Sequence, residues 1–162
     1  MIVPEKNLYN AVMNTANITT GGYVGSQMHT TNLEQAKTTI NAAFSGHVVN
    51  HRIYVVNQVT NGCASGGAWV DSEFDLMNEQ MVYGSGIFSP VSTGSAVPAN
   101  DRVEKNQLPL FAMNPAMLNI REHYWLRDVI SASSFAFVSS TGTASHFVAS
   151  SYFGVRPAFC IS

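Results

Sequence analysis

The chain has 162 residues, of which 46% are hydrophobic and 10% are aromatic. This length and composition predict a single folded domain over residues 1–162. The formal net charge is −2 and there is no basic stripe, so nucleic acid is not an expected partner. No apolar run approaches the ~20 residues of a membrane-spanning helix, so membrane insertion is not expected.

Charged residues make up only 11% of the chain, against about 25% in an average soluble domain. Two interpretations fit this value. The protein is a β-rich domain with strands coated by Ser, Thr and Asn, or it packs into an oligomer or a larger particle. The two cysteines, Cys63 and Cys160, are far apart in sequence and could either pair or remain buried thiols.

The first predicted helix spans residues 30–44. Thr31 and Glu34 have the spacing of a capping box, and apolar residues recur on one face of the helix. Residues 47–59 are rich in β-branched side chains and predict one or two strands. The apolar face of the helix contains Leu33, Ala36, Ile40, Ala43 and Phe44.

Residues 60–67, "TNGCASGG", predict a loop. A second helix is expected over residues 71–84. Ser72 is its candidate cap, the acidic residues after it suit a helix N-terminus, and Gly84 suits the end of the helix.

Residues 85–106 predict a long loop, and residues 108–111 a short strand. Pro115 predicts a turn or a single helical turn over residues 114–119. Short strands are expected from His123 to the end. Two helices followed by a β-rich half indicate the α+β class, with a mostly antiparallel core of short strands.

No catalytic arrangement emerges from the sequence. His47 and His51 are separated by residues typical of a strand, which places the two imidazoles too far apart to share a metal. Cys63 replaces the first glycine of a nucleophile-elbow motif. The acidic residues 71–75 are explained by a helix N-terminus. The sequence therefore predicts no enzyme activity, no catalytic residue, no metal and no cofactor.

The segment 129–153 has an unusual composition. Its 25 residues contain eight Ser, two Thr, four Ala, four Phe, one Tyr and no Asp, Glu, Lys or Arg. Two strings of more varied composition, which include charged residues, flank this segment: "WLRD" at 125–128 and "GVRPAF" at 154–159. This contrast raises the question of what the bland segment does.

The strings "HYWLRD", "FAFV" and "GVRPAF" resemble C-type-lectin-fold domains of the formylglycine-generating-enzyme-like subtype. More narrowly, the chain resembles the variable proteins of diversity-generating retroelements carried by phages. "NLYN", "GGYVGSQM", "TTNLEQAKTTI" and "LMNEQMVYG" extend the resemblance over most of the sequence.

The resemblance implies a C-type-lectin-like fold with two helices, and a variable ligand-binding segment at 129–153. It implies a receptor-binding or adhesin module on a phage tail fibre or another part of the virion surface, made in the bacterial cytoplasm. The expected partners are a host cell-surface protein or glycan and other virion proteins. Because phage fibres are commonly trimers, a homo-oligomer is also expected. The chain lacks the sequence motifs of calcium-dependent sugar-binding lectins, so the resemblance implies neither calcium nor sugar binding. It also lacks the paired active-site cysteines of formylglycine-generating enzymes, so the resemblance implies no enzyme activity.

The codon chemistry of such retroelements offers one check. Rewriting the adenines of an AAC or AAT codon cannot give Lys, Glu, Gln, Met or Trp. These five types account for 23 of the 162 residues, so roughly three or four are expected in 25, and the segment 129–153 has none. Half-buried strands also disfavour Lys, Glu and Gln, which leaves the alternative of an ordinary strand surface open.

The predicted binding residues combine aromatic rings with hydroxyl groups, as antibody paratopes do. For the phenylalanines the alternative is a core position, which Phe135 is expected to occupy. The predicted residues are Ser134, Phe137, Ser139, Ser140, Thr141, Thr143, Ser145, His146, Phe147, Val148, Ser151, Tyr152 and Phe153.

The flanking strings are expected to act as a scaffold. An aromatic anchor, charge-assisted hydrogen bonds and restricted backbone would hold the two ends of the variable segment. The predicted scaffold residues are Trp125, Arg127, Asp128, Gly154, Arg156 and Pro157. The alternative function is a structural decoration or connector protein of a virion that has no variable binding surface.

Overall fold

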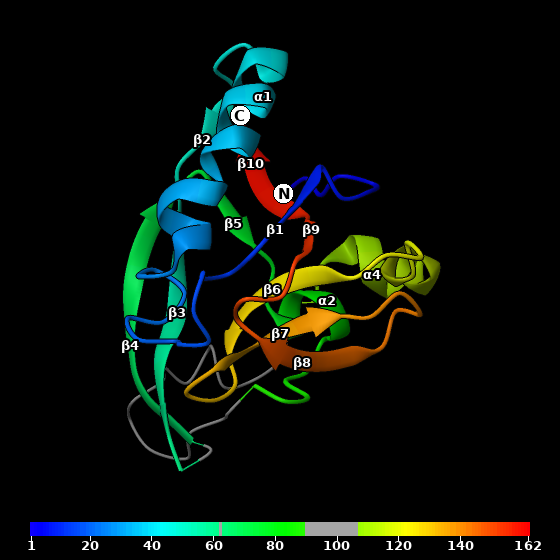
Figure 1. The fold of residues 1–162 in the computed structure, drawn as a ribbon. Coiled ribbons are helices and arrows are strands. Elements are labelled where there is room, and N and C mark those ends of the chain that lie inside the picture. The colour runs from blue at the N-terminus through cyan, green and yellow to red at the C-terminus, as the bar shows by residue number, and fades with distance from the viewer. Residues whose placement is uncertain (62, 90–106) are drawn as a thin grey trace.

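The computed structural model describes residues 1–61, 63–89 and 107–162 (Figure 1). The fold is mostly β, with 37% of the described residues in strands and 22% in helical conformation, and its main sheet is curled and mixed. The expected α+β class with a C-type-lectin-like fold is therefore wrong. The physical reason is that residues expected to form loop and helix between 60 and 76 pair as strands instead.

The largest sheet has five strands in the order β1-β9-β6-β7-β8. The pairing of β6 with β9 is parallel, and the other pairings are antiparallel. Two central strands are thus contributed by the predicted scaffold strings. The strands are β1 (Tyr9–Ala11), β6 (Tyr124–Val129), β7 (Ser134–Val138), β8 (Ala144–Val148) and β9 (Phe153–Val155).

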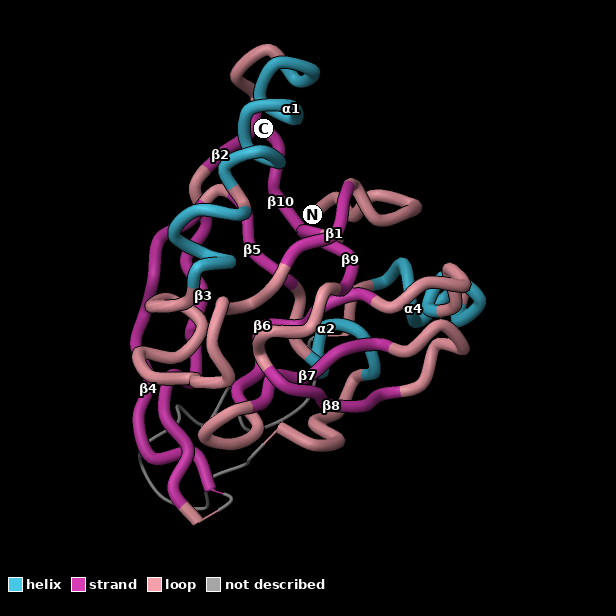
Figure 2. The backbone as a smooth tube through the Cα atoms, viewed as in Figure 1, coloured by secondary structure: helices cyan, strands magenta, loops and turns pink. Residues whose placement is uncertain are grey.

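Two smaller sheets complete the β structure. A three-stranded sheet has the order β2-β10-β5, and a two-stranded sheet is formed by the long hairpin β3-β4. This hairpin curls along one side of the molecule (Figure 2). The strands are β2 (Val48–Val49), β3 (His51–Thr60), β4 (Cys63–Ser72), β5 (Phe74–Leu76) and β10 (Pro157–Ile161).

The first predicted helix is confirmed as α1 (Glu34–Phe44), which follows a π-helical turn, η1 (Met28–Asn32). Its buried face contains Leu33, Ala36 and Ile40. The predicted capping box is wrong, because Leu33 occupies the N-cap position and no side chain caps the helix. The π-helical turn leads directly into α1, and the Leu33 N–H donates a hydrogen bond to the Met28 carbonyl of that turn at 2.9 Å.

The loop expected at 60–67 and most of the helix expected at 71–84 are wrong. Strand β4 covers the glycine-rich stretch, and a Cβ atom at Gly67 would lie only 2.5 Å from the Tyr54 hydroxyl and 2.6 Å from the Val55 carbonyl oxygen. Glycine there therefore permits the close approach of the two strands. Only α2 (Glu79–Tyr83) is helical, capped by Asn78 rather than Ser72.

Gly84 ends α2 in the left-handed conformation, with φ of 75°, as expected. The predicted strand at 108–111 is wrong, because α4 (Pro109–Met113) is a short helix that starts with proline. The predicted helical turn after it is confirmed as η2 (Pro115–Leu118). Residues 90–106 of the predicted loop lie outside the described residues. Cys63 and Cys160 are both free thiols, so they do not pair.

Apolar side chains cover both faces of the β6–β7 pair. One face buries Trp125, Phe135 and Phe137 against the hairpin and η1, whereas the other packs Tyr124 and Leu126 against α2 and α4. Burial on both faces makes β6 and β7 the rigid centre of the fold. Strand β8 continues this centre to the edge of the sheet.

Candidate functional site

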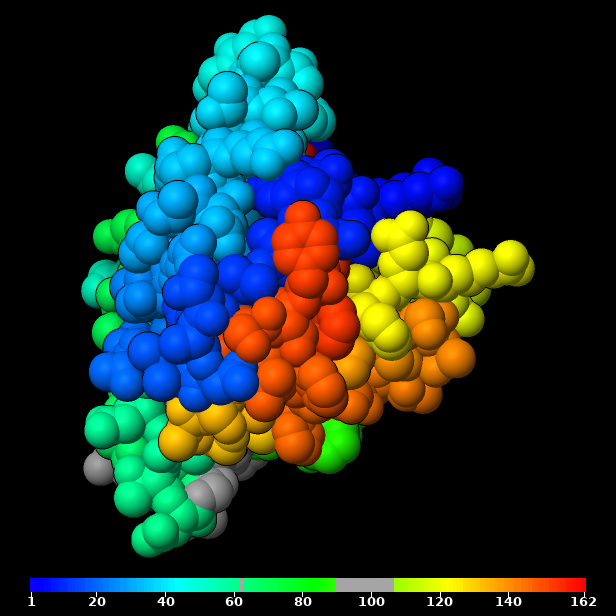
Figure 3. Space-filling model, viewed as in Figure 1, coloured from blue at the N-terminus to red at the C-terminus, as the bar shows by residue number. Residues whose placement is uncertain are grey.

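The C-terminal segment forms a continuous area on one face of the molecule. In Figure 3 the orange residues of the 140s and early 150s lie between the blue N-terminal region and the yellow region around residue 120. Strands β7 and β8 and the turn between them supply most of the segment. The predicted binding residues are thus gathered by one antiparallel pair and by the connection to β9.

The structure divides the thirteen predicted binding residues by exposure. Two are buried in β7, so they contribute to packing rather than to contact with a ligand: Ser134 and Phe137. Six are half-buried: Ser139, Ser140, Ser145, Val148, Ser151 and Phe153. Five are exposed: Thr141, Thr143, His146, Phe147 and Tyr152.

One of the exposed rings, Phe147, lies beside a packed cluster of aromatic rings. The Phe153 ring lies 4.7 Å from the rings of Trp125 and Phe137, measured between centroids. Phe147 lies 6.0 Å from Phe153 and is 52% exposed, whereas Tyr152 is 67% exposed. We use the name aromatic surface for His123, Phe147, Tyr152 and Phe153 together with the hydroxyls of the β7–β8 turn. A ring beside a fixed cluster offers contact area at little further cost in conformational entropy.

The turn between β7 and β8 is ordered by its own hydroxyl groups. The Ser139 Oγ lies 2.9 Å from the Thr141 Oγ1 and 2.7 Å from the Thr143 Oγ1. It also accepts hydrogen bonds from the backbone N–H groups of these two threonines. Gly142 adopts a left-handed φ of 83° at the tip, which favours glycine. The turn therefore presents two exposed threonines in a defined arrangement.

His123 belongs to the aromatic surface although the sequence did not single it out. Its ring lies 5.3 Å from Phe137 and 5.1 Å from Phe153. Its Nδ1 accepts a hydrogen bond of 3.0 Å from the Ser140 N–H, which fixes the turn relative to β6. His123 is the first residue of the string "HYWLRD", but only the sheet order shows that its ring reaches this surface.

Residues from the N-terminal third also reach this area. A hollow of about 380 Å³ beside Tyr152 is lined by β1, η1 and the first turn of α1, with Gln27, Asn32 and Gln35 among its polar groups. The Asn17 Oδ1 accepts a hydrogen bond from the Ser150 N–H at 3.1 Å. Sequence reasoning missed these residues, because only the fold brings them next to the C-terminal segment.

The first scaffold string is held by hydrogen bonds to distant backbone groups. Trp125 is buried and donates from Nε1 to the Ala11 carbonyl at 3.0 Å. Arg127 is buried and donates from Nη1 to the Leu76 carbonyl at 2.8 Å. The Asp128 Oδ2 accepts from the Glu79 N–H, at the start of α2, at 2.8 Å. These contacts connect β6 to three other parts of the fold.

The second scaffold string is held by the N-terminal segment. Arg156 is fully buried and donates to the carbonyls of Pro4, at 2.8 Å, and Met117, at 3.0 Å. Its guanidinium also lies 5.0 Å from the centre of the Tyr124 ring, which is cation–π geometry. A Cβ atom at Gly154 would collide with the Asn7 side chain. Pro157 is buried at the start of β10.

Glu79 is a buried carboxylate that organises the loop after α2. Its Oε2 accepts hydrogen bonds from the N–H groups of Ile87, Phe88 and Ser89 at 2.6 to 2.9 Å. Burial, together with the nearby Glu79 charge, raises the pKa of Asp128 to about 6. The anchored loop places the Phe88 ring 5.1 Å from the ring of His146 on β8.

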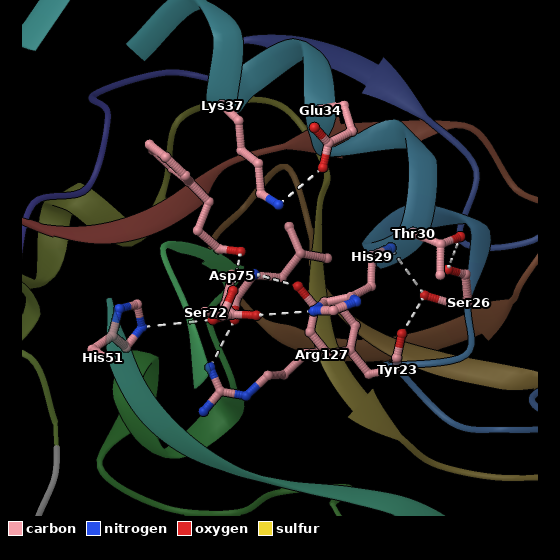
Figure 4. Close-up of polar contacts among 12 residues, drawn as sticks. Tyr23, Ser26, His29, Thr30, Glu34, Lys37, His51, Ser72, Asp75 and Arg127 are labelled. Atoms are coloured by element: carbon pink, nitrogen blue, oxygen red, sulfur yellow. Dashed lines mark hydrogen bonds and ion pairs between the residues drawn. The ribbon is translucent and has the colours of Figure 1, made fainter. Parts of the chain in front are cut away.

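A second buried polar side chain, Asp75, belongs to β5 and lies away from the aromatic surface (Figure 4). The Asp75 side chain lies between two histidines, with its Oδ1 3.8 Å from the His29 Nε2 and its Oδ2 3.6 Å from the His51 Nε2. The Tyr23 hydroxyl accepts a hydrogen bond from the Leu76 N–H at 2.9 Å. Burial lowers the pKa of His29, and the Asp75 charge only partly opposes this effect.

The contacts of Asp75 connect three elements, η1, β3 and β5, and its exposure is only 1%. A substrate has no direct access to this carboxylate. Within the described ranges, no three or more His, Cys, Asp or Glu side chains are grouped so that they could hold a metal ion. The arrangement therefore connects elements of the fold and offers no open site for a ligand.

Comparisons with known proteins give one match. A family model described as "Domain of unknown function (DUF6273)" matches residues 92–162, the part of the chain that contains both scaffold strings and the aromatic surface. Neither the curated proteins nor the solved structures yield a match. No helix within the described residues is both long enough and apolar enough to cross a membrane.

Proposed function

We propose that the protein is a receptor-binding module of a phage or phage-derived particle, of the retroelement-diversified type. Its aromatic surface binds a protein or glycan on the host cell, and the protein performs no catalysis. The observation that carries the proposal is the exposure of Phe147, at 52%, and Tyr152, at 67%, on a segment without charged residues. The expected locations are the virion surface after assembly and the bacterial cytoplasm during synthesis.

The physical chemistry of the surface supports binding. An exposed ring beside a packed aromatic cluster can lose water on contact without a large rearrangement. The hydroxyl groups of Thr141 and Thr143 can form adaptable hydrogen bonds. Because the segment 129–153 contains no Asp, Glu, Lys or Arg, a partner can cover it without removing water from those ions. Weak binding by one copy would be strengthened by display of several copies, which suits the expected oligomer.

The proposal rests on the aromatic surface and on the resemblance of the sequence strings to the variable proteins. Support comes from the way in which the two scaffold strings are buried while the segment between them emerges at the surface. A segment held at both ends by β6 and β9 can change its exposed side chains with little effect on the fold.

The first test is deep sequencing of codons 125–159 in the natural population that carries this gene. We expect differences to concentrate at the five exposed and six half-buried positions, in codons derived from adenine-rich templates. We expect constancy at residues 125–128 and 154–159, and little variation at Ser134 and Phe137. A uniform segment, or variation spread equally over buried and exposed positions, would contradict the proposal.

The alternative is a virion decoration or connector protein. The observation that favours it is exposed apolar area away from the aromatic surface, with Met113 at 81% and Trp69 at 46% exposure. Such residues could be covered by neighbours in a shell. A particle that assembles without this protein but no longer adsorbs to cells would support the receptor-binding function over this alternative.

A further inference from the structure

Strand β8 forms one border of the five-stranded sheet. It pairs with β7 along one side, and no other strand in the described part of the chain pairs with its second side (Figure 1). Four of the five β8 residues belong to the predicted binding residues: Ser145, His146, Phe147 and Val148. The free border of the sheet therefore lies within the aromatic surface.

The hydrogen-bond register determines which backbone groups face the free side. The Ser139 N–H donates to the Thr143 carbonyl at 2.8 Å, and the Ala149 N–H donates to the Ser133 carbonyl at 2.9 Å. Hydrogen-bonded pairs alternate with non-bonded pairs in an antiparallel ladder. Thr143, Ser145, Phe147 and Ala149 therefore direct their backbone groups toward β7, and the residues between them direct theirs outward.

The outward groups are the N–H and C=O of Ala144 and His146 and the N–H of Val148. The Val148 carbonyl is already used, because it accepts from the Ser151 N–H at 3.0 Å. Outward residues recur every second position, about 6.6 to 6.8 Å apart. This spacing of donors and acceptors matches the backbone of another extended polypeptide.

Proteins usually protect such a border with proline, charged side chains or a bulge. Strand β8 has the sequence "ASHFV" and contains no proline and no Lys, Arg, Asp or Glu. Its register with β7 is regular from Ala144 to Val148. The register of β6 with β7, in contrast, is interrupted between Trp125 and Val129. Strand β8 thus keeps a regular and uncharged border.

Aromatic rings lie on both faces of this border. Phe147 projects on the same face as Phe135 and approaches Phe153. His146 projects on the opposite face and contacts Phe88, which belongs to the loop that Glu79 anchors. A strand added to β8 would place alternate side chains against Phe147 on one face and against Phe88 on the other.

We propose that β8 binds an extended polypeptide segment of the ligand as an additional strand of the sheet. The inference rests on the proposed receptor-binding function and specifies its ligand as a protein rather than a glycan. Backbone pairing would supply an affinity that is independent of the ligand sequence, and the rings on the two faces would supply selectivity. A replaceable surface gains from this division, because backbone pairing persists when its side chains change.

The test compares His146→Pro with the matched control His146→Ala. Both variants lose the imidazole, but only proline removes the outward N–H and obstructs the added strand. The His146 N–H has no partner in the ladder with β7, so proline removes no hydrogen bond from that ladder. The probe is a displayed library of random twelve-residue peptides, selected on the wild-type protein. We expect selected peptides to bind His146→Pro at least ~10-fold more weakly than His146→Ala.

Two further measurements keep the test decisive if His146→Pro does not fold. Binding of a selected peptide should slow amide hydrogen exchange at Ala144, His146 and Val148 by at least ~10-fold, with little change at Ser145 and Phe147. N-methylation of every second residue of the peptide should abolish binding when the methylated N–H groups face β8. It should leave binding unchanged when the methylated N–H groups face away from β8. No peptide enrichment, or equal binding to the proline and alanine variants, would overturn the inference.

Two other outcomes would also overturn it. A concentration-dependent dimer of the wild-type protein that His146→Pro abolishes would show that a second copy of the chain occupies β8. Binding to purified host glycans that needs Phe147 and Tyr152 but not the β8 backbone would leave the receptor-binding function intact and exclude strand addition. A uniform segment 129–153 in the natural population would instead remove the proposed function itself.

Discussion

The scaffold strings and the segment between them distribute charge and apolar area in opposite ways. Arg127 and Arg156 are buried, with exposures of 7% and 0%, whereas Phe147 and Tyr152 are exposed and their segment has no charged side chain. In most proteins charged groups lie outside and large apolar groups inside. The reversal teaches that the two regions serve different purposes: buried polar contacts fix the backbone, and exposed rings remain available for contact.

The largest expected effect comes from removal of a buried charge of the scaffold. Arg156→Ala should lower the free energy of unfolding by about 3 kcal/mol or more, because it leaves two carbonyl groups without donors and creates a cavity between aromatic rings. The matched control is Arg52→Ala, since Arg52 is exposed and its contacts, with the Trp69 ring and with the Asp71 carboxylate at 3.9 Å, lie at the surface. Urea-induced unfolding measures both values. Similar losses for the two variants would contradict the assigned difference.

A smaller effect should separate two neighbouring rings of the aromatic surface. Phe153→Ala should cost about 2 kcal/mol, because Phe153 packs on Trp125 and Phe137. Tyr152→Ala should change the free energy of unfolding by no more than ~0.5 kcal/mol, because Tyr152 is largely exposed. Urea-induced unfolding of the two single variants makes the comparison. An equal cost would place both rings in the core.

Ligand binding should depend on the exposed rings rather than on Phe153. The double variant Phe147→Ala/Tyr152→Ala should keep the wild-type urea midpoint to within the precision of the measurement. It should lose at least ~90% of attachment to host cells, because exposed aromatic anchors dominate binding energy. A flow-cytometry assay with the labelled protein measures attachment. A folded double variant that attaches normally would remove these residues from the binding site.

The pH dependence of the free energy of unfolding should report the raised pKa of Asp128. Its pKa in the folded protein is raised to about 6, whereas the unfolded value is near 3.9. Between these values the folded chain retains a proton that the unfolded chain has released, so stability falls as pH rises through this window. Asp128→Asn should lack this contribution and still accept a hydrogen bond from the Glu79 N–H. Urea midpoints of both proteins from pH 4 to 7 measure the difference.

The smallest expected effect is a change in the pKa of His29, which lies beside the buried Asp75 carboxylate. Burial lowers the pKa of His29, whereas the Asp75 charge raises it. An NMR titration of the wild-type protein should therefore place His29 below the ordinary value of 6.5. Asp75→Asn should shift its titration further toward acidic pH, since only the opposing charge is removed. A shift toward alkaline pH would mean that another group controls His29.

Local patterns predicted part of this fold well. The apolar spacing of Leu33, Ala36 and Ile40 located α1, Gly84 located the end of α2, and Pro115 located a helical turn. These signals succeed because they depend on neighbours in sequence. The β-rich C-terminal half was also expected from its short uncharged stretches and its turn residues.

The remaining errors come from tertiary contacts that sequence spacing does not contain. Phe74, Met77 and Met81 repeat with helical spacing, yet Phe74 pairs in β5 because β10 lies beside it. Gly67 indicated a loop, but close packing against Tyr54 makes it a strand residue. The candidate site also depends on tertiary contacts that the sequence does not show. Composition located the segment 129–153, whereas His123 and the hollow beside Tyr152 required the sheet order.

The hydrogen bond between Arg156 and the Pro4 carbonyl joins residues 152 positions apart, and β1 pairs with β9 across a similar distance. Contacts between such distant parts of a chain form slowly, because a long loop must close first. During synthesis on the ribosome, β1 therefore cannot pair with β9, nor Ile2 with Phe159 of β10, until these C-terminal strands have been synthesised. Variants that differ only on the aromatic surface share this late step, so their folding rates should be alike even when their ligands are not.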